Sequence, residues 1–495
     1  MTPGGPLLIL AIVLPVAAIL LLMLLGGRWL PRLVPVFLAA GLAVAVAIFV
    51  LVWESGAPIV YVVGGWQPPL GIVLRADGIS AVMMAVTAII ICAAGAFAWA
   101  DFGQSPAAPE ARQPIVFWCL LLAIWLALNA LFLSGDLFNL YVALELLTFA
   151  AVPLVCIKGS AATLQAALRY LLYAVLGSML YLLGAALIYG AYGTLDITSL
   201  SGLVKPEPVA FIAAALMTVG LLAKTALFPL HLWLPPAHAG APAAGSAVLS
   251  ALVVKGSFFL IVRLWFDAMP QLREPAAMQM LAALGAAAVL FGSILALRQK
   301  RLKLLVAYST VAQIGYLFFL FPLVSLAAPE AMWNGFAWTG GWLQLISHAF
   351  AKAAMFMAAG LIAEALGHDR IDDLGGAAKA VPLAVLTFAI SGLSLMGVPP
   401  SGGFSAKWLL LVASVGEGQW LWAVVILAGG LIAAAYVFRV LGRMVAPSGG
   451  GVEISPVAQG RQVIALGLAL VTLALAFVPL APSPLLQIGR MVTPS

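Results

Sequence analysis

Residues 222–229 read LAKTALFP and place Lys224 inside an otherwise apolar stretch, close before Pro229. A second stretch, MGVPPSGGFSAK at residues 396–407, likewise combines prolines and glycines with a lysine, Lys407. Because proline removes a backbone donor and interrupts a helix, each stretch predicts a broken helix that carries a charge. Interrupted helices at corresponding positions of two halves are typical of inverted-repeat transporters with ion sites near the membrane midplane. The alternative is that membrane helices simply tolerate more Pro and Gly, and the lysines favour the transporter interpretation.

The composition is typical of a protein that meets lipid over most of its surface. Of the 495 residues, 64% are hydrophobic and 8% are charged, whereas soluble proteins carry roughly 25% charged residues. The net charge of +6 comes from basic residues scattered over short loops, without the dense stripe typical of nucleic-acid binding. The composition therefore predicts an all-α polytopic membrane protein, embedded in a lipid bilayer, that does not bind nucleic acid.

Apolar segments of membrane-spanning length divide almost the whole chain. A hydrocarbon core about 30 Å thick needs roughly 20 apolar residues per helix, so the sequence predicts about 14 transmembrane helices. The two interrupted stretches fall in the seventh and twelfth of them. The predicted helices begin near residues 5, 30, 78, 115, 136, 163, 208, 242, 275, 302, 333, 380, 418 and 462.

Basic residues in the loops indicate how these helices cross the membrane. If the amino terminus lies outside, fourteen Lys and Arg residues, Arg461 among them, fall on the inner side, and five, Arg263 among them, on the outer side. This asymmetry predicts that both termini lie on the outer, periplasmic side of a bacterial inner membrane. The first apolar run follows Met1 without a basic region, so we expect it to be retained as a helix.

Four further basic residues lie inside predicted helices: Lys224, Lys255, Lys352 and Lys407. A lysine at the bilayer centre costs at least about 2.5–3.5 kcal/mol, so each needs a partner, water or a change of protonation state. Burial disfavours the charged ammonium and a nearby carboxylate favours it, which lets a buried lysine gain and lose a proton near neutral pH. The four lysines therefore predict charge transfer inside the membrane.

Glu145 is the one acid far from both ends of a predicted helix. It lies nine residues past Asp136, about 13 Å along the helix axis, which places it close to mid-membrane. Its expected partner is Lys224, and opening or closing of this ion pair would couple to movement of a proton nearby. The alternative is a static salt bridge that fixes helix packing, but such a bridge does not explain three further lysines. Asp77 is predicted to cap the third helix, and Glu364 to reach water at the cytoplasmic end of the eleventh.

His348 and Lys352 are four residues apart and share one face of the eleventh helix. Because histidine titrates near physiological pH, His348 is a candidate relay between Lys255 and Lys407, with Lys407 as the outlet of the second half. The alternative is an interior histidine that only satisfies hydrogen bonds. The lysine one turn away favours the relay.

The sequence gives no sign of redox or metal chemistry in this chain. The cysteines at positions 92, 119 and 156 lie in apolar runs without C-x-x-C spacing, which argues against disulfides, iron–sulfur clusters and zinc. Sodium ligation needs several oxygen ligands, and the interior offers one clear carboxylate. No H-E-x-x-H motif, phosphate-binding glycine loop or serine–histidine–acid set supports the alternative of a membrane enzyme. We therefore expect no cofactor and no metal, and protons as the transported ion.

Five motifs together resemble one superfamily, the antiporter-like subunits shared by Mrp-type sodium/proton antiporters, respiratory complex I and membrane-bound hydrogenases. The resemblance covers roughly residues 70–445 and is most similar, in wording and length, to the D-type branch of the Mrp antiporter subunits. The motifs are GDLFNLYV at 135–142 leading to Glu145, AKTALFPLHLWLP at 223–235, Ala241-Pro242 followed by Lys255, SHAFAK at 347–352 and GGFSAK at 402–407.

The resemblance implies a role in proton transfer for six residues. Glu145 pairs with Lys224, Lys255 continues a hydrated axis, Lys407 ends it, and His348 and Lys352 lie between the last two. It also implies two inverted five-helix repeats. The chain then divides into residues 1–112 (helices 1–3), 113–266 (first repeat, helices 4–8), 272–445 (second repeat, helices 9–13) and 446–495 (a loop and helix 14).

The function implied by the resemblance is that of a proton-translocating subunit of a multisubunit Na+/H+ antiporter. The alternative is a proton-pumping subunit of a redox complex, of the NADH:quinone oxidoreductase or membrane-bound hydrogenase type, whose electrons run in other chains. Both imply other membrane subunits as partners, including homologous antiporter-like subunits. Cysteine-rich cluster motifs in the neighbouring chains would distinguish the redox alternative from the antiporter.

Overall fold

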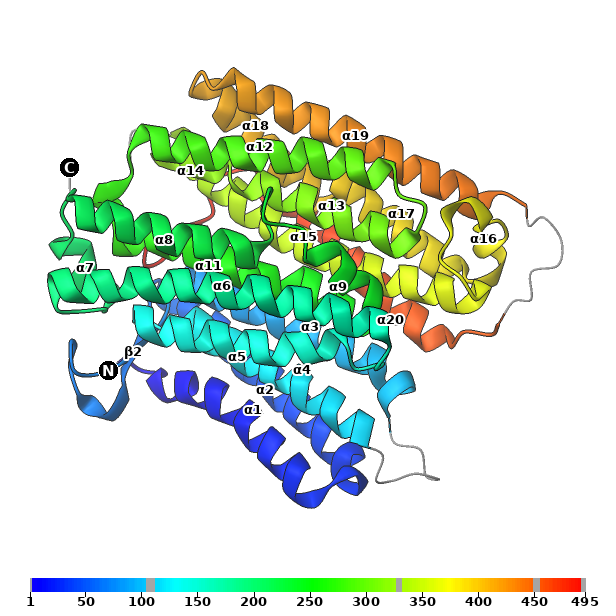
Figure 1. The fold of residues 1–495 in the computed structure, drawn as a ribbon, viewed down its shortest axis with the longest axis horizontal. Helices are drawn as coiled ribbons and strands as arrows, with labels where there is room; N and C mark the ends of the chain where they lie inside the picture. Colours follow the sequence, from blue (N-terminus) through cyan, green and yellow to red (C-terminus); the bar gives the residue numbers. More distant parts are fainter. Residues whose placement is uncertain (1, 104–111, 326–331, 448–454, 491–495) are drawn as a thin grey trace. The chain divides into compact units, whose positions relative to one another are not determined.

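The computed structural model describes residues 2–103, 112–325, 332–447 and 455–490, and most of them are helical (Figure 1). Among these residues, thirteen helices are long and apolar enough to cross a membrane. Two shorter apolar helices, α17 (Pro382–Met396) and α18 (Gly402–Gly416), follow one another at the twelfth predicted span. The prediction of an all-α polytopic membrane protein with about fourteen spans is therefore confirmed.

The spans follow the predicted order, and each begins within a few residues of its predicted start. The first six are α1 (Gly5–Leu25), α2 (Leu30–Ser55), α3 (Gly78–Phe102), α4 (Arg112–Leu133), α5 (Leu137–Val155) and α6 (Ala161–Tyr192). Next come α8 (Pro208–Thr225) with α9 (Leu234–Gly240), then the span Ala243–Ala268, which contains α10 (Ala243–Val248), α11 (Val254–Val262) and two π-helical stretches. The rest are α12 (Pro275–Leu297), α13 (Leu302–Leu317) with α14 (Leu320–Ser325), α15 (Met332–Leu366), α17 with α18, α19 (Trp420–Val445) and α20 (Gln459–Ala474). Short elements complete the described part: α7 (Ile197–Leu203), α16 (Ala377–Ala380), α21 (Pro484–Gln487) and the antiparallel strands β1 (Ile59–Val62) and β2 (Val73–Ala76).

Both predicted helix breaks are present, and a left-handed residue follows the helix in each. Helix α8 ends at Thr225, Ala226 takes a φ of 57°, and a helix resumes only at α9. Helix α17 is followed by Gly397 with a φ of 80°, and the hydroxyl of Ser401 caps α18 by accepting the backbone N–H of Phe404 at 3.1 Å. Glycine takes such a φ without a steric penalty. The broken seventh and twelfth helices are therefore confirmed.

The order and length of the spans repeat after five helices. Each half has two spans, then a helix of more than 30 residues (32 in α6 and 35 in α15), then a broken helix. A 26-residue span closes each half, at Ala243–Ala268 and at α19. Because successive spans cross the membrane in opposite directions, helices five spans apart run in opposite directions, as inverted repeats require.

Contacts between Cα atoms divide the chain into two compact units. Unit one contains residues 1–225, 252–274 and 484–495, and unit two contains 226–251 and 275–483. In unit one α6 packs along α8, and Figure 1 shows the two helices side by side. In unit two α13, α17 and α18 each pack on α15. These units are defined by contacts, whereas the four segments predicted above are defined by chain order and remain a prediction.

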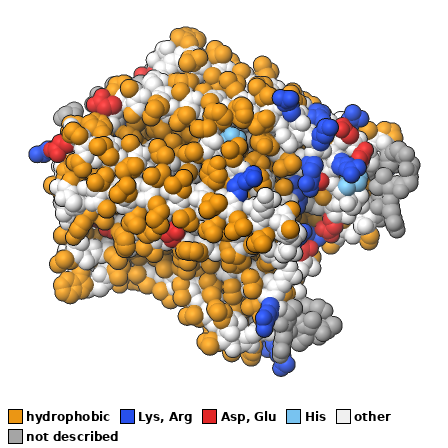
Figure 2. All heavy atoms as spheres, in the orientation of Figure 1, with side chains coloured by type: hydrophobic (Ala, Val, Ile, Leu, Met, Phe, Trp, Pro, Cys, Tyr) orange, Lys and Arg blue, Asp and Glu red, His pale blue; other side chains and the backbone are white. Residues whose placement is uncertain are grey.

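The surface agrees with a membrane environment. Figure 2 shows hydrophobic side chains over most of the visible face, with few charged side chains between them. Large apolar side chains such as Leu172 and Leu431 are more than two-thirds exposed. A soluble monomer rarely exposes apolar patches of this extent, so these side chains face lipid or partner helices. The chain is a multi-pass membrane protein.

Candidate proton-transfer site

The structure brings Glu145 and Lys224 into direct contact within unit one. Glu145 lies in the middle of α5, and Lys224 lies on the last turn of α8, just before the helix break. Their Oε1 and Nζ atoms are 3.3 Å apart. The lysine side chain is 5% exposed and the carboxylate side chain is 16% exposed, so the pair is largely shielded from solvent. A buried ion pair of this kind is stable only if further hydrogen bonds satisfy its remaining donors and acceptors.

Two hydroxyl groups and a carbonyl supply those hydrogen bonds. Lys224 Nζ donates to Thr148 Oγ1 at 2.8 Å and to the backbone oxygen of Leu144 at 3.3 Å. Ser178 Oγ, from α6, donates to Glu145 Oε1. Sequence reasoning missed both hydroxyl residues. Thr148 had a signal, since it lies three residues after Glu145 and shares its helix face, whereas nothing in the sequence of α6 singles out Ser178.

Two glycines let α6 and α8 approach closely beside Lys224. A Cβ atom built on Gly220 would collide with the backbone oxygen of Gly177, and a Cβ on Gly177 would lie 3.3 Å from Lys224 Cγ. The backbones of the two helices are therefore in contact at this level. This contact sets the depth at which Lys224 meets Glu145 and Ser178.

Replacing Gly220 by alanine is expected to force α8 away from α6 and to lower stability by about 1–3 kcal/mol, the usual effect of overpacking. Thermal unfolding of the purified protein in detergent measures the change. The matched control is Gly190→Ala on α6, where a Cβ would meet nothing within 4 Å. Equal melting temperatures for the two variants would contradict the close approach.

Lys255 is completely buried on α11 in unit one. Helix α11 packs against α8, the helix that carries Lys224. The two lysines therefore lie on neighbouring helices.

Lys352 and His348 lie one turn apart on α15 in unit two, and both are buried. Lys352 Nζ donates to Ser309 Oγ at 2.5 Å and to the backbone oxygen of Val306 at 2.8 Å, both on α13. Ser309 Oγ in turn donates to Val306 O at 2.9 Å. The ammonium is thus held by neutral oxygens, an arrangement that accommodates both a charged and a neutral lysine.

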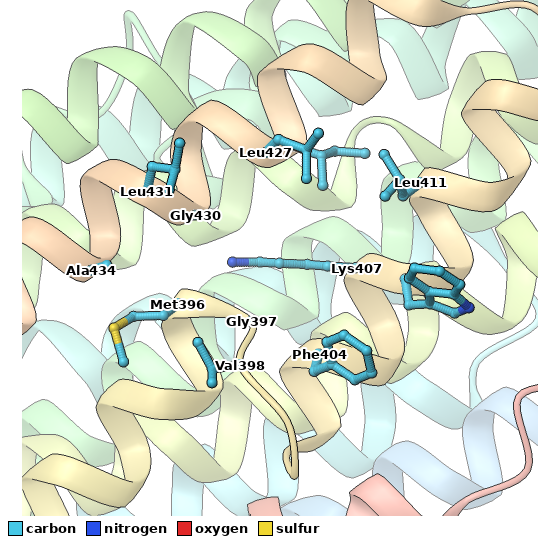
Figure 3. A pocket seen from close by; sticks show the side chains of 12 residues that line it. Met396, Gly397, Val398, Phe404, Lys407, Leu411, Leu427, Gly430, Leu431 and Ala434 are labelled. Carbon is cyan, nitrogen blue, oxygen red and sulfur yellow. The ribbon is translucent and has the colours of Figure 1, made fainter.

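Lys407 bonds across the break of the twelfth helix. Its Nζ donates to the backbone oxygen of Leu395 on α17 at 2.6 Å and lies 4.3 Å from the ring centroid of Tyr316 on α13. Figure 3 shows the lysine extended between the break and α19, where it lines a cavity of about 480 Å³ together with Gly397 and Leu427. The break frees the carbonyl that receives the ammonium, which explains why the lysine and the interruption occur together.

A network of amide and hydroxyl groups lies beside these two lysines. Gln313 Nε2 donates to Leu395 O at 2.9 Å, so Gln313 and Lys407 share one acceptor. Gln344 Nε2 donates to Gln313 Oε1 at 3.0 Å. Sequence reasoning missed both glutamines. The structure thus connects Lys407 to a polar network on α13 and α15, the helices that also hold Lys352.

A second buried charge cluster in unit one was not predicted. Arg263 was expected in an outer loop, and that prediction is wrong, because Arg263 lies inside the span Ala243–Ala268 and is 9% exposed. Its Nη1 atom is 2.6 Å from both Asp77 Oδ2 and Asp267 Oδ2, and its Nη2 donates to Ser80 Oγ at 2.9 Å. Asp77 also accepts the backbone N–H of Ser80 at 3.0 Å, so its predicted role as a helix cap is confirmed. The i,i+4 spacing of Arg263 and Asp267 was the signal that could have found this cluster.

Arg461 was also expected in a loop, and that prediction is wrong. It lies in the first turn of α20 and is 7% exposed. Its Nη1 atom donates to both carboxylate oxygens of Glu364, at 2.8 and 3.0 Å. Glu364 therefore joins α15 to α20, although its side chain is partly exposed, as expected.

Comparison with known proteins gives a consistent result. Residues 134–433 match the sequence profile of the family described as NADH:quinone oxidoreductase/Mrp antiporter, TM. The chain is 35% identical over 454 residues to NADH-quinone oxidoreductase subunit N of Desulforudis audaxviator, covering 89% of this chain and 86% of that protein. It is 29% identical over 434 residues to the D-type Na(+)/H(+) antiporter protein of Alkalihalophilus pseudofirmus, covering 86% of this chain and 84% of that protein. A chain in the structure of the Mrp complex from Dietzia sp. DQ12-45-1b has 26% identity and a TM-score of 0.86, over 96% of this chain and 95% of that one.

Proposed function

Because this chain belongs to the NADH:quinone oxidoreductase/Mrp antiporter family, we propose that it is the proton-translocating subunit of a multisubunit monovalent cation/proton antiporter. The observation that carries the proposal is the buried pair of Glu145 and Lys224, completed by Thr148 and Ser178. A buried charge left alone is costly, so the protonation states of the two partners are coupled.

The coupling works through the ion pair. While Glu145 and Lys224 are in contact, each stabilises the charge of the other. When the pair opens, the hydroxyl of Ser178 stays with the carboxylate, and the ammonium loses its strongest acceptor. Lys224 then releases a proton more readily, and Lys255 on the neighbouring helix is the proposed next acceptor.

The second half of the proposed path uses His348, Lys352 and Lys407. Lys352 and Lys407 are each bonded to neutral backbone or hydroxyl oxygens, which do not fix the lysine in its charged state. Each can therefore accept and release a proton without breaking an ion pair. His348, one turn before Lys352, is proposed to pass the proton on.

Protons are the proposed ion for this path. Sodium prefers several oxygen ligands, whereas Glu145 is already bonded to an ammonium and a hydroxyl. By the charge asymmetry of the loops, both termini lie on the outer side of a bacterial inner membrane. The likeness to a chain of an Mrp complex supports assembly with other membrane subunits, homologous antiporter-like subunits among them.

A second candidate function is favoured by one observation. The relative with 35% identity is part of an NADH-quinone oxidoreductase. In that case the same residues would move protons, driven by electron transfer in partner chains.

Purification of the intact complex from membranes, with identification of every chain, tests the two functions. For an antiporter we expect partners without iron–sulfur clusters, and a sodium gradient imposed on proteoliposomes should drive proton movement. Proton movement driven only by quinone reduction, with cluster-bearing partners, would overturn the antiporter proposal in favour of the redox complex.

A further inference from the structure

Tyr436 on α19 belongs to none of the motifs described above, yet its side chain lies among the polar groups of unit two. The residue is completely buried. Its hydroxyl lies beside the side chains of Gln313 and Ser309. Among the described residues, however, the hydroxyl completes no hydrogen bond of ordinary geometry, and neither does Gln344 Oε1.

Two such atoms in one polar cluster require an explanation. Leaving a buried donor or acceptor unsatisfied costs about 1–3 kcal/mol. Buried polar groups in proteins are therefore nearly always bonded to protein or to ordered water. A buried water needs two to four polar partners, and this cluster offers Tyr436, Gln344, Gln313 and Ser309.

The position of the cluster connects it to two of the proposed transfer residues. Ser309 and Gln313 are four residues apart on α13, about 6 Å along the axis, and face the same side. Ser309 accepts from Lys352, and Gln313 shares the carbonyl of Leu395 with Lys407. The Tyr436 hydroxyl lies beside both α13 side chains.

We propose that Tyr436, with Gln344, Gln313 and Ser309, binds ordered water that completes a proton relay between Lys352 and Lys407. The relay rests on the proposed function, whereas the binding of water does not. The glutamine pair is fixed by its own hydrogen bond and orients the acceptor oxygens. The phenol both donates and accepts one hydrogen bond, as a relay group must.

The chemistry of the step balances. Lys352 loses a proton, Lys407 gains one, and each O–H bond of water that breaks is replaced by one that forms. The water and the phenol are thereby restored. Tyr436 is a positioning residue in this scheme, because it acts by holding water between the two lysines.

The test uses Tyr436→Phe, which removes the hydroxyl and keeps the ring that packs in the core. High-resolution cryo-electron microscopy of the intact complex should show water density within hydrogen-bond distance of the Tyr436 hydroxyl in the wild type and none in the variant. Proton flux in proteoliposomes should fall roughly a hundredfold, at the low end of what a positioned proton-transfer group contributes. Tyr308→Phe, a hydroxyl deletion at a half-buried position on α13, should leave density and flux unchanged.

Several outcomes would overturn the inference. Absence of water density in the wild type, or density unchanged in Tyr436→Phe, would contradict the binding site. Normal flux in Tyr436→Phe would contradict the relay. Should that variant not assemble, Gln344→Met removes the other open acceptor and must show the same two losses. Normal flux in Lys407→Ala would instead contradict the proposed function, and the density comparison would still decide whether water binds.

Discussion

Replacing Lys224 by alanine is expected to abolish proton-coupled transport, with flux falling by at least roughly 10²-fold, the contribution typical of a positioned proton-transfer group. The reason lies in the contacts of the ammonium, which bonds to Glu145, Thr148 and Leu144 O. Without it, Glu145 keeps only the hydroxyl of Ser178 among these contacts and binds a proton in place of the pair. A pH-sensitive dye in vesicles that contain the complex measures the flux.

A matched double variant separates transport from folding. Removing one partner of a buried pair is strongly destabilising, whereas replacing both by groups of similar volume is often neutral. Glu145→Gln combined with Lys224→Met is therefore expected to restore the melting temperature and the assembly of the complex but not the flux. Restored flux in the double variant would show that the pair is only structural. Normal flux in Lys224→Ala would count equally heavily against the proposed path.

Replacing Arg263 by methionine is expected to lower stability by about 3–5 kcal/mol, the usual loss when one partner of a buried ion pair is removed. The guanidinium lies 2.6 Å from a carboxylate oxygen of Asp77 and 2.6 Å from one of Asp267, so its removal leaves two buried acids facing each other. Denaturant unfolding of the purified protein in detergent measures the loss.

The control for Arg263 is Arg301→Met. Arg301 pairs with Asp369 at 3.0 Å, but its side chain is 53% exposed, so the expected loss is below about 1 kcal/mol. Similar losses for the two variants would contradict the structural importance of the Arg263 cluster. The cluster lies where the carboxyl-terminal segment packs on unit one, since Arg75 donates to the backbone oxygen of Gly489 at 2.5 Å. We expect the same variant to increase proteolysis of that segment.

The fold was largely predictable because the physics of the bilayer acts on short stretches of sequence. Each span needs a run of apolar residues, and those runs are visible without knowledge of any partner helix. The breaks at Pro229 and Gly397 were equally visible, since proline and glycine act on the local backbone. The loop positions of Arg263 and Arg461 were the errors, because a long side chain near a helix end can turn inward to an acid that the sequence places far away.

The candidate site was predictable only in its charges. A lysine or glutamate inside an apolar helix is costly enough to draw attention wherever it occurs, which is why Glu145, Lys224 and Lys407 could be named from the sequence. A serine, glutamine or tyrosine costs far less, and many membrane helices carry one without consequence. Ser178, Gln313 and Tyr436 therefore gave no signal.

By itself the sequence determined that this chain crosses the membrane about fourteen times, that two of its helices are broken, and that charges lie between its apolar residues. Only the tertiary structure decided which neutral groups meet those charges: Ser178 and Thr148 at the first pair, and Gln313 beside Lys407. The physical reason is range. Helix formation and insertion depend on residues within one stretch of chain, whereas a hydrogen bond between helices depends on which faces meet, and that is fixed by packing of the whole unit.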